Sequence, residues 1–406
     1  MKLAGLDILV VGNPPPGFGG RYFIFVKLTT ACGIVGWGEV YAATVGPDAM
    51  RAVIADVFAR HMEGESPENI ELMFRRAYSS GFTQRADPTV MGAFSGLEIA
   101  CWDILGKARD RPVHALWGGR VRDRLRAYTY LYPEPGEDPA TFYSDPDASA
   151  ARAARMVREG FTAVKFDPAG AYTIRGGHQP SIPDLDRSEA FCKRIREAVG
   201  DRADLLFGTH GQFTPAGAIR LARRIARYDP LWFEEPIPPD LPLDLARVAA
   251  QSPVPIAAGE RLTTAGEFAT LLRAGGVSIL QPSLGRVGGL LQARKVAILA
   301  EGFGAQIAPH LYAGPIAWAA AIQLALSIPN FLILESIGSG AGFHADLLTR
   351  RVTFEDGYVL PPDAPGLGVE IDEAVARAHP WTGDRLHLEM SSDPPDPRGG
   401  APFAGG

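Results

Sequence analysis

Two glutamates at the ends of successive apolar runs are the first residues in this sequence that could act together in chemistry. Glu234 lies near the end of LWFEEP (231–236), and Glu260 ends PIAAGE (255–260). If these runs are neighbouring parallel strands, both carboxylates reach a common point beyond the strand ends, where hard oxygen ligands suit Mg²⁺. The alternative for either glutamate is an ion pair with an arginine such as Arg261. The spacing therefore favours a metal site.

Lysine and histidine side chains end other apolar runs and would face the same place. Lys165 and Asp167 alternate with apolar residues in TAVKFD, so both point inward if this run is a barrel strand. His210 and His310 each end a further run, and Glu335 lies in the last one. Such a convergent set of titratable groups suits proton abstraction and return. A structural ion pair is the alternative for the lysine, and a satisfied polar group is the alternative for each histidine.

Eight short apolar runs alternate with amphipathic stretches from residue 125 onward, which is typical of parallel βα units. They cover residues 125–132, 162–167, 205–210, 231–236, 255–260, 278–283, 305–310 and 332–336. Eight parallel strands with intervening helices predict an α/β fold of the (β/α)8 barrel type, whose chemistry sits at the carboxyl ends of the strands. A long insertion at 168–186 follows the second run and is expected to serve the site.

The rest of the chain predicts a second, smaller unit. Residues 21–40 indicate an antiparallel hairpin, and helical periodicity covers about 48–63, 67–79 and 89–110. We therefore predict an α+β domain over 1–124, the barrel over 125–350, a return to the first domain over 351–390 and a low-complexity, disordered tail over 391–406.

Composition excludes several classes of protein. The 406 residues are 46% hydrophobic and 21% charged, which is typical of a globular chain rather than a disordered, fibrous or membrane-embedded one. A formal charge of -6 without blocks of like charge argues against nucleic acid or a membrane surface as a partner and favours a small molecule. The N-terminal apolar run is too short for a signal or a membrane span, which predicts a cytoplasmic protein. Three dispersed cysteines argue against disulfides and structural zinc.

Several motifs taken together resemble the mandelate racemase subgroup of the enolase superfamily. They are GWGE (36–39), VKFD (164–167), FEEP (233–236), AGER (258–261), LQPSLGRVGG (280–289), APHLYAGP (308–315) and LESI (334–337). The resemblance covers about residues 1–375 and implies an N-terminal capping domain, a modified TIM barrel, one Mg²⁺ per subunit and a homo-oligomer. It implies Glu234 and Glu260 as metal ligands, Lys165 as the lysine of strand 2, His310 as the acid/base of strand 7 and Glu335 as a carboxylate near the substrate.

This sequence departs from the subgroup's pattern at three positions. Gly208 stands where the pattern has the aspartate that completes the metal site. His210, an acid/base position in sugar-acid dehydratases of the superfamily, is a candidate to ligate the metal instead, with Asp167 as the competing candidate. Ser283 replaces the aspartate that orients His310; its hydroxyl can accept from the imidazole but makes that histidine less basic. Asp167 replaces the second lysine of the KxK pattern, which disfavours a two-base racemase.

Substrate selection is expected from three loops, 13–21, 41–47 and the insertion at 168–186. In the insertion, Tyr172, Arg175 and His178 could reach hydroxyls or a distal carboxylate of a sugar acid. Asp167 and Ser283 are also predicted to contact the substrate.

The predicted function is Mg²⁺-dependent removal of the proton next to a carboxylate, followed by loss of a β-oxygen substituent, with Lys165, His210, His310 and Glu335 as catalytic residues. Loss of a hydroxyl from an aldonate or aldarate makes the protein an acid-sugar dehydratase. Loss of a ring oxygen from an anhydro or lactone ring makes it a cycloisomerase. An epimerase or racemase of a hydroxy acid, or a non-catalytic sugar-acid-binding barrel, would also be compatible with the motifs.

Overall fold

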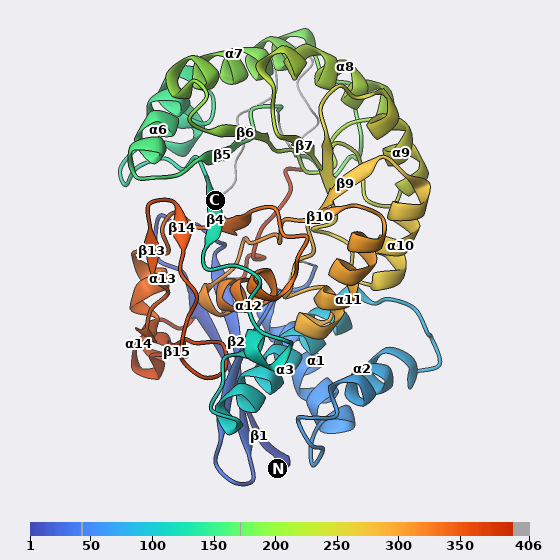
Figure 1. Cartoon of the computed structure of the whole chain (residues 1–406), viewed down its shortest axis with the longest axis vertical. Coiled ribbons are helices and arrows are strands. Elements are labelled where there is room, and N and C mark those ends of the chain that lie inside the picture. The colour runs from blue at the N-terminus through green and yellow to red at the C-terminus, as the bar shows by residue number, and fades with distance from the viewer. Residues whose placement is uncertain (42–43, 171, 393–406) are drawn as a thin grey trace.

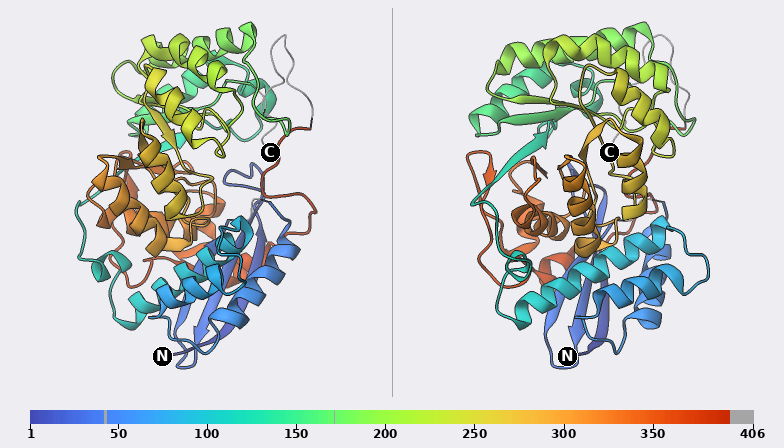
Figure 2. Two further views of the ribbon diagram at one scale, coloured as in Figure 1. Left: turned by 90° about the vertical axis from the view of Figure 1, so that its right-hand side faces the viewer. Right: turned by 45° about the vertical axis from the view of Figure 1, so that its right-hand side comes forward.

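The computed structural model describes residues 1–41, 44–170 and 172–392 of the chain. A three-stranded sheet with its helices lies at one end, and the barrel helices form an arc at the other (Figures 1 and 2). This arrangement confirms the predicted α/β class, with an α+β cap on a (β/α)8 barrel. Within the described residues no helix combines the length and the apolar character that crossing a membrane requires. The cytoplasmic location stays a prediction.

The N-terminal unit is an antiparallel sheet covered by helices. Its strands are β1 (Leu3–Gly12), β2 (Tyr22–Thr30) and β3 (Val35–Val40), and its helices are α1 (Pro47–His61), α2 (Ile70–Ser79), α3 (Pro88–Ala108) and α4 (Val113–Leu116). The predicted hairpin and three helices are present, whereas β1 was not predicted. Helix α3 lies directly on β3. The two backbones are so close that a Cβ added at Gly38 would stand 1.8 Å from the carbonyl oxygen of Gly96. Only glycine permits this close approach.

Eight parallel strands form the barrel in chain order, as the sequence predicts. Neighbouring strands pair in parallel, and the last strand pairs with the first. Between the seventh and eighth strands, Ile307 donates to the Asn330 carbonyl at 2.8 Å and accepts from the Leu332 amide at 2.8 Å. The strands are β4 (Leu125–Tyr130), β5 (Ala163–Phe166), β6 (Asp204–Phe207), β7 (Trp232–Glu234), β8 (Ile256–Ala258), β9 (Val277–Leu280), β10 (Gln306–Ile307) and β11 (Leu334–Ser336).

Helices cover the outside of the barrel and fix where each strand-end loop begins. Two of them start with reciprocal capping boxes, Ser181 with Asp184 and Thr264 with Glu267, which hold the loops after β5 and β8. The helices are α5 (Pro139–Phe142), α6 (Pro146–Arg158), α7 (Ile182–Val199), α8 (Pro215–Ile225), the 3₁₀ turn η1 (Ala226–Tyr228), α9 (Pro242–Gln251), α10 (Ala265–Ala274), α11 (Gly289–Gly302) and α12 (Pro315–Ser327).

The chain after the barrel returns to the N-terminal unit. A short hairpin first extends the barrel sheet along β4, and the backbone of Trp381 then donates to Val10 in β1 at 3.0 Å. The elements are α13 (Phe343–Asp346), β12 (Leu348–Arg350), β13 (Phe354–Glu355), β14 (Tyr358–Val359), β15 (Glu370–Ile371) and α14 (Glu373–Ala378). The bounds of the four predicted segments stay predictions, and most of the predicted disordered tail, residues 393–406, lies outside the described residues.

Two buried glutamates of the N-terminal unit join it to the barrel. Glu39 accepts hydrogen bonds from the amides of Gly314 (2.5 Å) and Ala317 (2.8 Å) at the start of α12. Glu98 accepts from two amides at the start of α11, at 2.7 and 2.9 Å. Burial raises the pKa of Glu39 to about 7 and that of Glu98 to about 8, against these backbone donors. The cap is therefore fixed to the ends of two barrel helices.

Candidate active site

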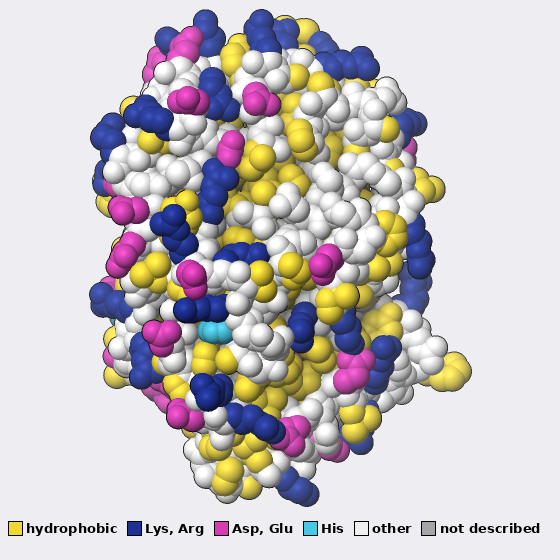
Figure 3. Space-filling model, in the orientation of Figure 1, with side chains coloured by type: hydrophobic (Ala, Val, Ile, Leu, Met, Phe, Trp, Pro, Cys, Tyr) yellow, Lys and Arg dark blue, Asp and Glu magenta, His cyan; other side chains and the backbone are white. Residues whose placement is uncertain are grey.

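A cavity of about 740 Å³ lies at the carboxyl ends of the barrel strands, beneath the cap. Its floor contains five of the predicted residues, Lys165, His210, Glu260, His310 and Glu335. Loop residues 15–18 of the cap contribute one wall, as predicted, together with Tyr41 and Thr44; residues 42–43 of the second predicted loop lie outside the described residues. On the outer face seen in Figure 3, basic and acidic side chains are interspersed.

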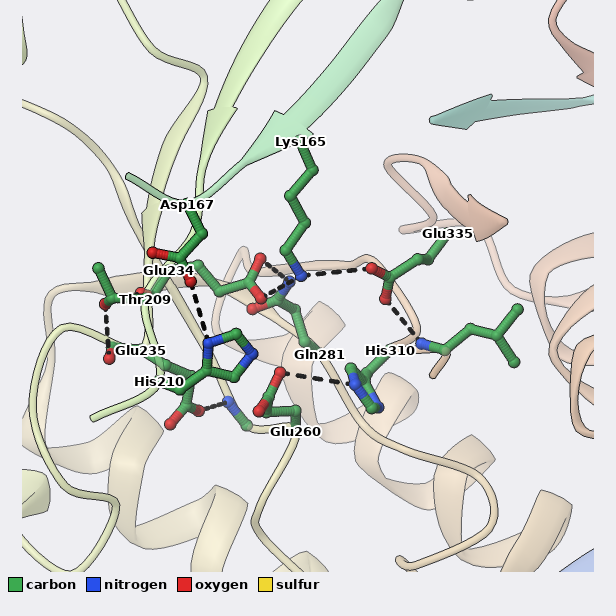
Figure 4. A network of polar contacts seen from close by, with 12 residues as sticks. Lys165, Asp167, Thr209, His210, Glu234, Glu235, Glu260, Gln281, His310 and Glu335 are labelled. Atoms are coloured by element: carbon green, nitrogen blue, oxygen red, sulfur yellow. Dashed lines mark hydrogen bonds and ion pairs between the residues drawn. The ribbon is translucent and has the colours of Figure 1, made fainter. Parts of the chain in front are cut away.

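Lys165 stands between two buried carboxylates (Figure 4). Its Nζ lies 2.5 Å from Oε1 of Glu234 and 3.2 Å from Oε1 of Glu335. Burial alone would lower the pKa of Lys165, but the two carboxylates outweigh it and hold that pKa well above the usual value. Burial raises the pKa of Glu335 to about 7, although Lys165 opposes the shift. In this arrangement Lys165 is an ammonium, so it can stabilise an anion but has no lone pair to accept a proton.

His310 faces Glu260 across the rim. Nε2 of His310 lies 3.6 Å from Oε2 of Glu260, while Arg261 lies 3.7 Å from the other oxygen. Burial lowers the pKa of His310 to about 3, assisted by the cations of Lys165 and Arg286 and opposed by Glu260. Burial would raise the pKa of Glu260, but the surrounding histidines and cations hold it far below the usual range. The pair thus consists of a neutral imidazole and an ionised carboxylate.

His210 is paired with Asp167. Nδ1 of His210 lies 3.1 Å from Oδ2 of Asp167, and the ring packs edge-on against Tyr172 at 4.4 Å. Asp167 is 8% exposed, and burial raises its pKa against the opposing effects of His210 and Lys165. The imidazole reaches into the cavity while the carboxylate lies behind it. An aspartate in this position fixes the orientation of the imidazole ring.

Ser283 does not make the contact with His310 that the sequence suggested. The two residues pair through their backbones, but Nδ1 of His310 is buried and has no hydrogen-bond partner among the described residues. Ser283 borders a small void behind His310 rather than the large cavity. The backbone pairing fixes the distance between the two segments that carry Ser283 and His310. The short serine side chain does not reach the imidazole across this distance.

The structure also keeps Arg175 and His178 out of the cavity lining. Arg175 is exposed, and His178 packs against the Phe213 ring at 5.4 Å. The amide of His178 donates to the Gln212 carbonyl at 2.9 Å, and its carbonyl accepts from Thr214 at 3.0 Å. These backbone bonds hold the insertion along the loop after β6. Of the three side chains in the insertion that were predicted to reach the substrate, Tyr172 lines the cavity, whereas Arg175 and His178 do not.

Several cavity residues were not predicted from the sequence. The first barrel strand and the residues after it supply Tyr130 and Tyr132, and Tyr132 stacks on Phe18 of the cap at 4.1 Å. The alternation in YTYLYP was the available signal. The guanidinium of Arg286 lies 4.5 Å above the Tyr41 ring, lines the cavity and forms no ion pair with any residue that the structure describes. It is an available cation for an acidic substrate.

A further wall comes from residues 386–391, which we call the C-terminal strap. His387 lies between two carbonyls, with Nδ1 2.9 Å from the Tyr22 oxygen and Nε2 3.0 Å from the Tyr312 oxygen. Arg21 donates to the Leu386 carbonyl at 2.7 Å, and Ser391 pairs with the backbone of 172–174. The strap therefore connects the cap, the loop after β10 and the insertion after β5 along one side of the cavity.

The donor atoms suit a hard divalent cation. Glu234 and Glu260 end neighbouring strands, and Oε2 of Glu260 is buried without a hydrogen-bond partner among the described residues. Glu235 adds a further buried carboxylate, bonded to the Gly259 amide at 2.7 Å, and burial raises its pKa to about 7. The described residues form no group of three or more His, Cys, Asp or Glu that could hold a metal. Glu234 and Glu260 are therefore the two carboxylates that such an ion could use here, and neutral oxygen ligands would complete its coordination.

The chain matches two family descriptions. Residues 148–375 match "Enolase C-terminal domain-like", and residues 18–118 match "Mandelate racemase / muconate lactonizing enzyme, N-terminal domain". A solved mandelate racemase/muconate lactonizing enzyme from Sulfitobacter sp has a TM-score of 0.96 at 64% identity, over 98% of this chain and 100% of that one. One from Jannaschia sp. CCS1 has a TM-score of 0.93 at 61% identity, over 96% and 100%.

Two curated relatives are named as enzymes. The D-xylonate dehydratase of Haloferax volcanii is 35% identical over 387 residues, which is 94% of this chain and 89% of the relative. The D-galactonate dehydratase of Ralstonia nicotianae is 35% identical over 365 residues, 87% of this chain and 90% of the relative.

Proposed function

This chain belongs to the mandelate racemase / muconate lactonizing enzyme family of the enolase superfamily, and we propose that it is a hydro-lyase that dehydrates a sugar acid. One observation carries the proposal: a neutral imidazole, His310, and an aspartate-supported imidazole, His210, face one cavity on either side of a buried ammonium, Lys165. Elimination of water needs these elements, namely a proton acceptor, a proton donor and a positive charge for the substrate's carboxylate.

The groups divide the work according to their charge. His310 accepts the proton next to the carboxylate, because a neutral imidazole carries a lone pair on one of its two ring nitrogens. His210, held by Asp167, donates to the departing hydroxyl. The Lys165 ammonium binds the carboxylate and the negative charge that develops on it, and Glu335 holds that ammonium in place. The proton thus leaves on one side of the substrate and water departs with a proton from the other.

Members of the enolase superfamily typically depend on Mg²⁺, and Glu234 and Glu260 would hold one such ion per subunit here. When bound, the ion supplies positive charge that makes the proton beside the carboxylate more acidic. Homo-oligomerisation is part of the same proposal and rests on the sequence resemblance alone.

Product analysis in D₂O tests the reaction type. Purified protein with Mg²⁺ is incubated with a panel of aldonates, aldarates and anhydro or lactone forms of sugar acids, and NMR follows both product and recovered substrate. A 3-deoxy-2-keto acid is the expected product, with no deuterated α-epimer of the substrate. His210→Asn should suppress product formation, whereas His178→Asn, which removes a histidine outside the cavity, should leave it unchanged. An epimer as the main product overturns the lyase, and a ring-opened acid from an anhydro or lactone substrate alone establishes the cycloisomerase instead.

A further inference from the structure

We propose that Oε1 of Gln281 is the third protein ligand of the divalent cation, in the place that Gly208 leaves without a side chain. The inference rests on the proposed function for the presence of the ion. It assigns to the metal site a neutral residue that no charge pattern in the sequence indicates. It also replaces His210 and Asp167, the two ligand candidates that the sequence favoured.

The amide of Gln281 is oriented by one hydrogen bond and left open on its other side. Its Nε2 donates to Oε2 of Glu234 at 2.8 Å, which determines that Oε1 faces away from that carboxylate. Oε1 is buried and has no hydrogen-bond partner among the described residues, and the residue is 0% exposed. A buried amide oxygen without a partner costs free energy, so its position calls for a ligand.

The position of Gln281 places its side chain near the strand ends that carry the two carboxylates. Gln281 follows β9 directly, and β9 pairs with β8, the strand before Glu260. Its amide extends past Glu260 to reach Glu234 at the end of β7. Oε2 of Glu260 is another buried oxygen without a hydrogen-bond partner among the described residues. Figure 4 shows Glu234, Glu260 and Gln281 turned toward the space below Lys165.

The other candidates are less suited to the ion. A side chain at Gly208 would meet Lys165, since a Cβ there lies 3.3 Å from Cε of that lysine. Asp167 and His210 are bonded to each other at 3.1 Å, and His210 is directed to the substrate side of the cavity. Mg²⁺ prefers oxygen ligands such as carboxylates and amide carbonyls over imidazole. Oδ1 of Asp167 is also buried without a hydrogen-bond partner among the described residues, but the carboxylate of Asp167 is engaged by His210. Gln281, in contrast, is bonded directly to Glu234, one of the proposed ligands. Gln281 is therefore the better placed of these candidates.

Direct metal binding by the whole protein tests this assignment. Mn²⁺ serves as the probe, its dissociation constant is measured by titration, and electron spin echo spectroscopy reports nitrogen bound to the ion. We expect Gln281→Leu to weaken Mn²⁺ binding at least about tenfold, since even residues that only support a ligand typically contribute 10–100-fold. Gln281→Glu keeps an oxygen ligand and should retain the affinity. Gln212→Leu, at a buried glutamine that bonds the Gly170 carbonyl at 3.0 Å, is the matched control and should bind as the wild type does.

Each result decides the matter. The inference is overturned by unchanged Mn²⁺ affinity in Gln281→Leu, by equal losses in Gln281→Leu and Gln281→Glu, or by a directly bound nitrogen in the wild-type spectrum. The wild-type spectrum needs no variant, so a misfolded substitution does not remove the test. If the wild type binds no Mn²⁺, or if Glu260→Gln has no effect on binding, the metal in the proposed function fails as well. Retained binding that depends on Glu260 but not on Gln281 overturns the ligand assignment alone.

Discussion

Replacing Asp167 by asparagine should slow the loss of a hydroxyl without slowing the loss of a better leaving group. The substitution preserves shape but removes the charge 3.1 Å from Nδ1 of His210. A hydrogen bond to a charged group contributes about 1.5–3 kcal/mol. At 1.36 kcal/mol per factor of ten, this predicts that kcat for a hydroxy acid falls about 10- to 160-fold.

The assay compares two substrates that differ only at the β-position. One carries the natural hydroxyl and the other carries fluoride, which leaves without accepting a proton. For Asp167→Asn, kcat with the hydroxyl substrate should fall while kcat with the fluoro substrate stays close to that of the wild type. Asp184→Asn, which removes another buried carboxylate from the cap of α7, controls for general destabilisation. Equal losses on both substrates, or no loss on either, would refute the assignment of Asp167 as the residue that positions His210.

Two further outcomes are expected. Arg286→Met should raise KM for an acidic substrate about 10- to 100-fold with a smaller change in kcat, because a charge-assisted contact is lost. Arg294→Met, which removes an arginine stacked on Trp117, is the control and should leave KM unchanged. Steady-state kinetics that show the same KM for Arg286→Met and the wild type would contradict this role of Arg286. The free energy of unfolding should fall as pH rises from about 5 to 8, by no more than about 1.4 kcal/mol per pH unit. The reason is that the pKa of Glu98 is raised from 4.5 to about 8, so the folded protein keeps a proton that the unfolded chain releases. Chemical denaturation across this range should give a flatter profile for Glu98→Gln, and an unchanged slope would contradict the role of this group.

The barrel could be predicted because its signal is repeated and local. Each strand is a short apolar run bounded by turn residues, and eight repeats leave few competing architectures. The same alternation places Lys165 and Asp167 on the inward face, and both lie there. Strand β1 could not be predicted as readily, because its apolar run is short and ends at a proline cluster. The local sequence pattern therefore predicted the repeated barrel strands better than the single strand β1.

The partners within the site could not be predicted from spacing. Strand alternation brings Asp167, His210 and Ser283 to one rim but does not say which pairs with which. The loop that carries His178 follows backbone bonds to 212–214, and nothing in its composition encodes them. Gln281 was not predicted because a neutral amide carries no charge pattern. Its relevance depends on an unpartnered oxygen, which only three-dimensional packing reveals.

The C-terminal strap has a consequence for the order in which this molecule matures. Arg21 and Leu386, which hold the strap to the cap, are 365 residues apart in the chain. Most barrel strands, in contrast, pair with the next strand along the chain. Contacts of such long range are costly to close early, because the loop between them is still unordered. During synthesis the cap loop that ends at Arg21 therefore emerges long before its partner exists. We therefore expect the barrel to assemble while this side of its cavity is still open, and the cavity to be completed only when the strap closes over it.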